Sequence, residues 1–162
     1  MMNGKLRNMT AIYLLRGDSV LLLYRQGGRV VNEVWTGSAG GHFENHELND
    51  ARACVLREME EELGISEKSI EGLTLRYITL RNTKGEIRQN YYFFATLKDD
   101  VGTPVSNEGI CQWFSLSEIS KLEMPFTAKY VMEHYVANGR LTNELYVGVA
   151  GADTMVFSPL EA

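Results

Sequence analysis

The stretch that decides the fold is Gly40–Ile65, which reads GGHFENHELNDARACVLREMEEELGI. It predicts a loop that starts at a pair of glycines and leads into a helix over residues 50–63. Asn49 or Asp50 is the expected N-cap, and Gly64 stands where a left-handed residue ends a helix. No glycine or proline interrupts the segment between them. The stretch therefore predicts one helix with well-marked ends behind a glycine-rich loop.

The end of this helix is unusually acidic. Four of the five residues from 58 to 62 are glutamates. At 100° per residue, Glu58, Glu61 and Glu62 share one face of the helix, whereas Glu60 points away from it. Like charges at these spacings cost about 0.2–0.5 kcal/mol per pair, and carboxylates in the last turn also oppose the helix dipole. Local stability alone does not favour this arrangement.

Two interpretations of the acidic face are open. The face could be a solvated surface that Arg52 and Arg57 partly compensate. It could instead hold a divalent cation, because Mg²⁺ and Mn²⁺ accept carboxylate oxygens and keep positions open for water and phosphate. The preceding loop favours the cation, since Gly40 and Gly41 allow close approach of the backbone to a ligand and Glu47 adds a carboxylate. The sequence thus predicts a divalent-metal site where the loop meets the helix.

The spacing of these residues resembles the Nudix box, G-x5-E-x7-R-E-U-x-E-E-x-G-U, in which U is a bulky aliphatic residue. The chain matches every specified residue, as Gly41-x5-Glu47-x9-Arg57-Glu58-Met59-x-Glu61-Glu62-x-Gly64-Ile65. One spacing departs from the pattern, because nine residues rather than seven separate Glu47 from Arg57. We expect the two extra residues around Leu48 and Asn49, before the helix begins, so that the register of the helix is unchanged.

The resemblance implies a Nudix hydrolase of the α/β class, with one domain over residues 1–162 and a mixed β-sheet between helices in an alpha/beta/alpha sandwich. By similarity, Mg²⁺ (or Mn²⁺ as a substitute) would be held by the Gly40 carbonyl, Glu58, Glu61 and Glu62. Glu47 and Arg57 would form an orienting ion pair, and one of the box glutamates would deprotonate water. The catalytic set would then be Glu47, Arg57, Glu58, Glu61 and Glu62. In MutT-like members a further acid from a loop completes the metal site, and Glu108 fits that position.

The rest of the chain predicts mostly strands. We expect hairpins over 10–15 and 20–25, over 73–81 and 86–97 with a turn at 82–85, and over 144–149 and 154–157, together with a short strand at 112–116 and a helix at 127–138. Ser115 or Ser117 is the candidate cap of a helical turn after the short strand. Strands and helices in this mixed order indicate a mixed sheet that is covered by helices.

Composition narrows the class of protein. A length of 162 residues fits one domain, and a net charge of -5 argues against a broad basic surface for a nucleic-acid polymer. Cys54 and Cys111 have no spacing that suggests zinc or a disulfide framework. We see no signal peptide or membrane span and expect a cytoplasmic protein without a membrane partner. An acidic protein of this kind can bind a polyphosphate only where metal ions make the local electrostatic potential positive.

A looser resemblance outside the box is to MutT-type enzymes that act on oxidised purine nucleotides. It implies hydrolysis of a nucleoside triphosphate to a nucleoside monophosphate and pyrophosphate by metal-activated water. The alternatives are an ADP-ribose, dinucleoside polyphosphate or nucleotide-sugar pyrophosphatase, or a non-catalytic nucleotide-binding module. Candidate substrate contacts are Arg25, Arg81 and Arg88 for phosphate, Trp35, Tyr91 and Phe126 for stacking on a base, and Asn90 for a base or ribose. Such arginines are more often ordinary surface residues, and aromatic residues beside strands are more often core residues.

Overall fold

A computed structural model describes residues 3–27 and 33–162 of the chain. Its strands are β1 (Leu6–Arg16), β2 (Ser19–Arg25), β3 (Trp35–Thr36), β4 (Ala39–His42), β5 (Ile70–Thr83), β6 (Glu86–Leu97), β7 (Gly109–Ser115), β8 (Tyr146–Ala150) and β9 (Met155–Pro159). Its α-helices are α1 (Ala51–Leu63) and α2 (Phe126–Ala137). Short 3₁₀ turns lie at Asn45–Glu47, Glu67–Ser69, Leu116–Lys121 and Gly139–Leu141.

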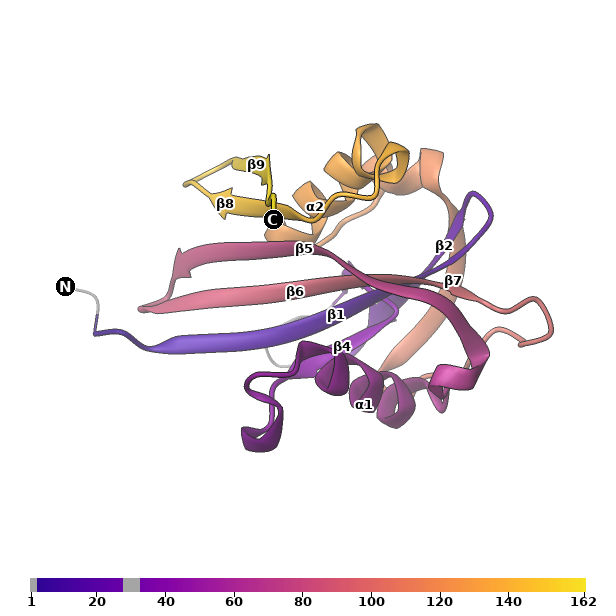
Figure 1. Ribbon diagram of the computed structural model, residues 1–162. Coiled ribbons are helices and arrows are strands. Elements are labelled where there is room, and N and C mark those ends of the chain that lie inside the picture. Colours follow the sequence, from indigo (N-terminus) through magenta and orange to yellow (C-terminus); the bar gives the residue numbers. More distant parts are fainter. Residues whose placement is uncertain (1–2, 28–32) are drawn as a thin grey trace.

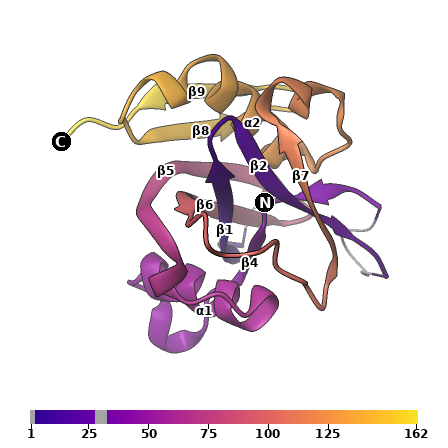
Figure 2. The ribbon, with the colours of Figure 1, turned by 90° about the vertical axis from the view of Figure 1, so that its right-hand side faces the viewer.

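The strands form one sheet between the two helices. The order is β3-β2-β1-β6-β5-β8-β9, with β4 paired to β1 and β7 paired to β2. Strand β1 runs parallel to β6 and β5 runs parallel to β8, whereas the other pairs are antiparallel. Figures 1 and 2 show α1 on one face of the sheet and α2 on the opposite face. The predicted α/β fold with a mixed sheet between helices is confirmed.

The predicted hairpins are present, and most of their strands are longer than the pattern indicated. β1 and β2 meet at a tight turn in which Gly17 has a φ of 57°. β5 and β6 meet at Lys84-Gly85, with φ values of 52° and 74°, as a two-residue turn requires. Asn82 and Thr83, which we expected in the turn, are instead paired with β6. Because both residues are polar, the sequence pattern indicated a turn rather than a strand at these positions.

Helix α1 has the ends that the sequence predicts. The Asp50 side chain accepts a hydrogen bond from the Ala53 N–H at 3.0 Å, and Gly64 closes the helix with a φ of 65°. The 3₁₀ turn after β7 begins at Ser115, whose side chain and that of Glu118 form a reciprocal capping box. Within the described parts of the chain, we find no helix with both the length and the apolar character to cross a bilayer.

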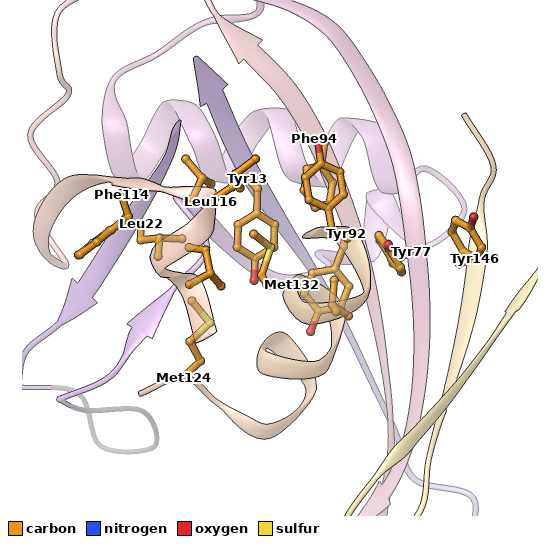
Figure 3. Packing of buried hydrophobic residues seen from close by; sticks show 14 residues of the cluster. Tyr13, Leu22, Tyr77, Tyr92, Phe94, Phe114, Leu116, Met124, Met132 and Tyr146 are labelled. Atoms are coloured by element: carbon orange, nitrogen blue, oxygen red, sulfur yellow. The ribbon is translucent and has the colours of Figure 1, made fainter. Parts of the chain in front are cut away.

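Alternating residues of the central strands build a separate core on each face of the sheet. Tyr13 of β1 packs with Tyr92, Phe94 and Met132 on the face covered by α2, as Figure 3 shows. Its neighbours Ile12 and Leu14 point the other way and pack against Val55, Met59 and Leu63 of α1. Burial of apolar side chains on both faces holds each helix firmly against the sheet. The acidic face of α1 is thereby fixed beside the edge where β4 pairs with β1.

Candidate active site

Strand β4 brings two glycines to the acidic face of α1. In the antiparallel ladder with β1, Gly40 lies opposite Ala11 and Gly41 opposite Thr10. A Cβ atom at Gly41 would collide with the carboxylate of Glu58, and a Cβ atom at Gly40 would lie 2.8 Å from the Cα of Ala11. Glycine at position 41 therefore lets α1 bring the Glu58 carboxylate directly against the backbone of β4, and glycine at position 40 lets β4 lie close to β1.

The loop between β4 and α1 is held by an ion pair between Glu47 and Arg57. Arg57 donates to both oxygens of Glu47, from Nε at 2.7 Å and from Nη2 at 2.9 Å. The Glu47 side chain is 1% exposed and also accepts the Glu44 N–H at 3.0 Å. These hydrogen bonds lower the pKa of Glu47 to about 2 against the effect of burial, and they raise the pKa of Arg57. The 3₁₀ turn at Asn45–Glu47 and the turn after it accommodate the two extra residues.

The same guanidinium group touches two glutamates of the acidic face. Arg57 Nη1 lies 3.0 Å from Glu58 Oε1 and 3.0 Å from Glu61 Oε2. Arg57 Nη2 also donates to the carbonyl oxygen of His42, the last residue of β4, at 3.1 Å. One arginine therefore ties the loop, the end of β4 and two acids of α1 into one unit.

Glu62 is the acid with the most unusual surroundings. Its side chain is 10% exposed, and its Oε2 is buried without a hydrogen-bond partner among the described residues. Burial raises the pKa of Glu62 to about 7, against the nearby charge of Arg25 and a backbone hydrogen bond from Gly40, and the charges of Glu58 and Glu108 raise it further. A buried carboxylate oxygen without a partner fits an additional cation at this position.

Glu108 approaches this group through Arg25. Arg25 Nη1 lies 3.7 Å from Glu108 Oε2, and Arg25 Nη2 lies 3.9 Å from Glu62 Oε1. The short strand β7, paired with β2, presents Glu108 at its start, with Gly109 opposite Arg25. The predicted loop acid thus lies beside the acidic face, with an arginine between it and Glu62.

Glu58, Glu61 and Glu62 line one pocket of about 750 Å³ together with Gly40 and Gly41. Their carboxylates are not gathered into one tight cluster: Glu58 and Glu61 contact Arg57, whereas Glu62 lies beside Arg25. In the described parts of the chain, the group with three ligand atoms within 4.8 Å of one another is instead Glu44, His46 and Glu47. In that group the buried carboxylate of Glu47 is already bound by Arg57.

The rest of the pocket contains most of the predicted substrate contacts. Arg25, Arg81, Arg88, Asn90 and Phe126 all line it. Trp35, whose ring the sequence left open as a stacking or a core residue, does not line it in the described structure. The ring packs instead on Tyr24 and Phe114, with centroids 4.9 Å and 4.6 Å away. Tyr91 lies on the opposite side of β6 and packs against the core beneath α1.

Sequence reasoning missed two pocket residues, Arg7 and His42. Arg7 Nε donates to His42 Nε2 at 2.7 Å, and both residues line the pocket. Arg7 reaches the pocket because β1 runs parallel to β6, which places it level with Arg88. Parallel pairing between distant strands leaves no local spacing pattern, so this neighbour relation cannot be read from the sequence.

Comparison with known proteins agrees with this geometry. The model of the NUDIX domain matches residues 5–135. No curated protein sequence is significantly similar to the chain.

Several solved structures share the fold. The MutT protein from Bacillus halodurans is 23% identical with a TM-score of 0.65, and the match covers 94% of this chain and 97% of that one. The MutT protein from Methanosarcina mazei Go1 is 20% identical with a TM-score of 0.67 and coverage of 83% and 96%. An Ap4A hydrolase from C. elegans is 19% identical with a TM-score of 0.63 and coverage of 82% and 96%. At these identities the likeness establishes a common fold.

Proposed function

The chain belongs to the Nudix family of hydrolases, and on that premise we propose that it cleaves a nucleoside triphosphate, ordinary or oxidised, to a nucleoside monophosphate and pyrophosphate. The observation that carries the proposal is the placement of Glu58, Glu61 and Glu62 against the Gly40-Gly41 backbone in a pocket that also holds several arginines. Acids and arginines facing one cavity suit a substrate that carries both a metal-bound polyphosphate and further polar groups.

Nudix hydrolases generally use a divalent metal, and the donor set here suits Mg²⁺ or Mn²⁺. Hard carboxylate oxygens are the preferred ligands of these ions, and the buried Oε2 of Glu62 has no hydrogen-bond partner among the described residues. We assign Glu58, Glu61, Glu62 and the Gly40 carbonyl to the metal, with Glu108 as the additional acid. When bound, the metal supplies positive charge to the polyphosphate and lowers the pKa of a coordinated water.

The chain's own residues orient and neutralise the reacting groups. Arg57 fixes the loop through Glu47 and keeps Glu58 and Glu61 on the pocket side of α1. Arg25 lies within reach of phosphate oxygens in the same pocket and is free to exchange its long contacts with Glu62 and Glu108 for a phosphate. A carboxylate of the acidic face accepts the proton of the attacking water. No covalent enzyme intermediate is required for this hydrolysis.

The direct test is a hydrolysis panel with matched glutamate variants. Wild type, Glu61→Gln and Glu60→Gln are incubated with Mg²⁺ and nucleoside triphosphates, ADP-ribose, dinucleoside polyphosphates or nucleotide sugars. Glu60 is exposed and points away from the acidic face, so Glu60→Gln makes the same charge change on the same helix outside the site. We expect Glu61→Gln to lower kcat by about 10²–10⁴-fold and Glu60→Gln to retain activity.

The panel also decides between the alternatives. Preferential cleavage of ADP-ribose, a dinucleoside polyphosphate or a nucleotide sugar would replace the triphosphate as the substrate. Binding of nucleotides without turnover by wild type on any member of the panel would instead identify a non-catalytic binding module.

A further inference from the structure

Three arginines stand side by side across the sheet at one end of the pocket. Arg7 of β1 is level with Arg88 of β6, and Arg88 is level with Arg81 of β5. Residues directly opposite one another in neighbouring strands project to the same face of a sheet. All three side chains line the pocket. We refer to Arg7, Arg81 and Arg88 as the arginine row.

The row carries more positive charge than its neighbours neutralise. Arg88 Nε and Arg7 Nη1 approach the same oxygen of Glu86, at 3.0 Å and 3.5 Å. Arg81 has no carboxylate or carbonyl partner among the described residues, and its guanidinium group lies 4.3 Å from the ring centre of Phe126. Among the described residues, Glu86 is thus the one carboxylate that contacts the row, and it contacts Arg7 and Arg88 but not Arg81. In a protein of net charge -5, this local excess of positive charge is suited to binding an anion.

Neighbouring side chains hold this charge in place. His42 Nε2 accepts the hydrogen bond from Arg7 Nε at 2.7 Å, so His42 is neutral in this contact. The Phe126 ring supports Arg81 in a cation–π contact. Guanidinium groups fixed in this way lose little freedom on binding a phosphate or a carboxylate.

The row lies well away from the acidic face. Gly40 and Gly41 are level with Ala11 and Thr10 of β1, so Arg7 is three to four residues further along the strand. At 3.3 Å per residue, the Cα atom of Arg7 is about 10–13 Å from the Cα atoms of Thr10 and Ala11. Asn90 lies between the two ends of the pocket, level with Met9, and its buried Oδ1 has no hydrogen-bond partner in the part of the chain that the structure describes. A diphosphate bound at the glycines would not reach the row, whereas the rest of the substrate would pass Asn90 and arrive there.

We propose that the arginine row recognises a second anionic group, a phosphate ester or a carboxylate, on the part of the substrate remote from the diphosphate. The proposal rests on the proposed hydrolysis of a nucleotide in this pocket and specifies the class of substrate. The substrate is then a nucleoside triphosphate, or one of the alternative nucleoside diphosphate derivatives, that carries a further negative charge about one nucleoside length from the cleaved bond.

Binding to matched pairs of nucleotides tests the proposal. The pairs are ADP-ribose and its 2′-phosphate, dephospho-coenzyme A and coenzyme A, and UDP-glucose and UDP-glucuronate, so that the first two add a phosphate ester and the third adds a carboxylate. Calorimetry with Mg²⁺ uses the Glu61→Gln protein, in which turnover is suppressed. We expect the member with the extra anion to bind at least about tenfold more tightly in one or more pairs.

Variants of Arg81 identify the row as the source of the preference. In the same background, Arg81→Gln should bring the two affinities of the preferred pair within about twofold, and Arg81→Lys should keep part of the difference because it retains the charge without the planar fork. Arg52→Gln is the control, since Arg52 pairs with Glu67 on the exposed side of α1. The proposal is overturned if no pair shows a preference, or if Arg81→Gln weakens both members of each pair equally.

Turnover of the same pairs by the wild-type protein separates this proposal from the proposed function. Hydrolysis of both members at equal kcat/KM would overturn the role of the row and leave the hydrolase activity standing. Tighter binding of the extra-anion member without hydrolysis of any nucleotide would support the row and overturn the proposed reaction.

Discussion

Arg57 binds the buried carboxylate of Glu47 through two hydrogen bonds, although nine residues lie between them in the chain. The pair closes the loop onto α1, and the remaining guanidinium nitrogen reaches the acidic face. The stability of the loop and the alignment of the candidate metal ligands therefore both depend on this one ion pair.

Glu47→Gln should destabilise the protein by about 2–4 kcal/mol at pH 7, because it removes one partner of a buried, bidentate ion pair. The pKa of Glu47 is lowered to about 2, so its contribution to stability is complete above pH 4.5 and is lost as the pH falls toward 2. Urea unfolding from pH 7 to pH 3 should show a smaller loss of stability for Glu47→Gln than for wild type. Parallel curves for the two proteins would contradict this origin of the pH dependence.

Glu62 should have the opposite effect in protein held in EDTA. Burial raises its pKa to about 7, so ionised Glu62 destabilises the folded state and the penalty grows as the pH rises from 4.5 through 7. We expect Glu62→Gln to raise the free energy of unfolding by about 1–2 kcal/mol at pH 8, after discounting for partial solvent screening, and by much less at pH 5. A destabilised Glu62→Gln protein at pH 8 in EDTA would refute this account.

Mg²⁺ should raise the melting temperature of the wild-type protein. A ligand at 100-fold above its Kd stabilises the folded state by about 2.7 kcal/mol, or roughly 5–10 °C for a chain of this length. Glu61→Gln should reduce this shift, whereas Glu60→Gln should keep it. Equal melting temperatures with and without Mg²⁺ in wild type would count against a cation at the acidic face.

Gly41→Ala should impair the site with little effect on the rest of the fold. The added Cβ would meet the Glu58 carboxylate and push it from its place beside β4. We expect about a tenfold or greater loss of kcat/KM and a smaller Mg²⁺ shift in melting temperature. Gly102→Ala is a suitable control because nothing lies within 4 Å of its added Cβ. Unchanged activity in Gly41→Ala would show that this close approach is unimportant.

The sequence predicted those parts of the molecule that depend on nearby residues. The ends of α1 follow from Asp50 and Gly64, which act on the backbone next to them. The shared face of Glu58, Glu61 and Glu62 follows from the period of the helix, as the pocket lining bears out. These features need no knowledge of the tertiary structure.

Features that depend on distant pairing escaped prediction. β3 and β4 are too short to show alternation, and β4 is half glycine. The parallel registers of β1 with β6 and of β5 with β8 are set by packing across the whole chain. The side that Trp35 faces is set in the same way, since an aromatic residue beside a strand can face either the pocket or the core. Only the assembled sheet decides which.

The unbroken pairing of β1 with β6 from Leu6 to Leu15 has a consequence for selection by size. The arginine row lies on β1, β6 and β5, and the glycine end lies on β4, which pairs with β1, so backbone geometry sets the span between the two ends. Such a pocket selects substrates by length: in the proposed reaction pyrophosphate would occupy one end alone, whereas a substrate bound by the arginine row would bridge both ends. Cleavage of such a substrate would leave two fragments, each bound at one end of the pocket and more weakly than the intact substrate. Weaker binding favours the release of both fragments.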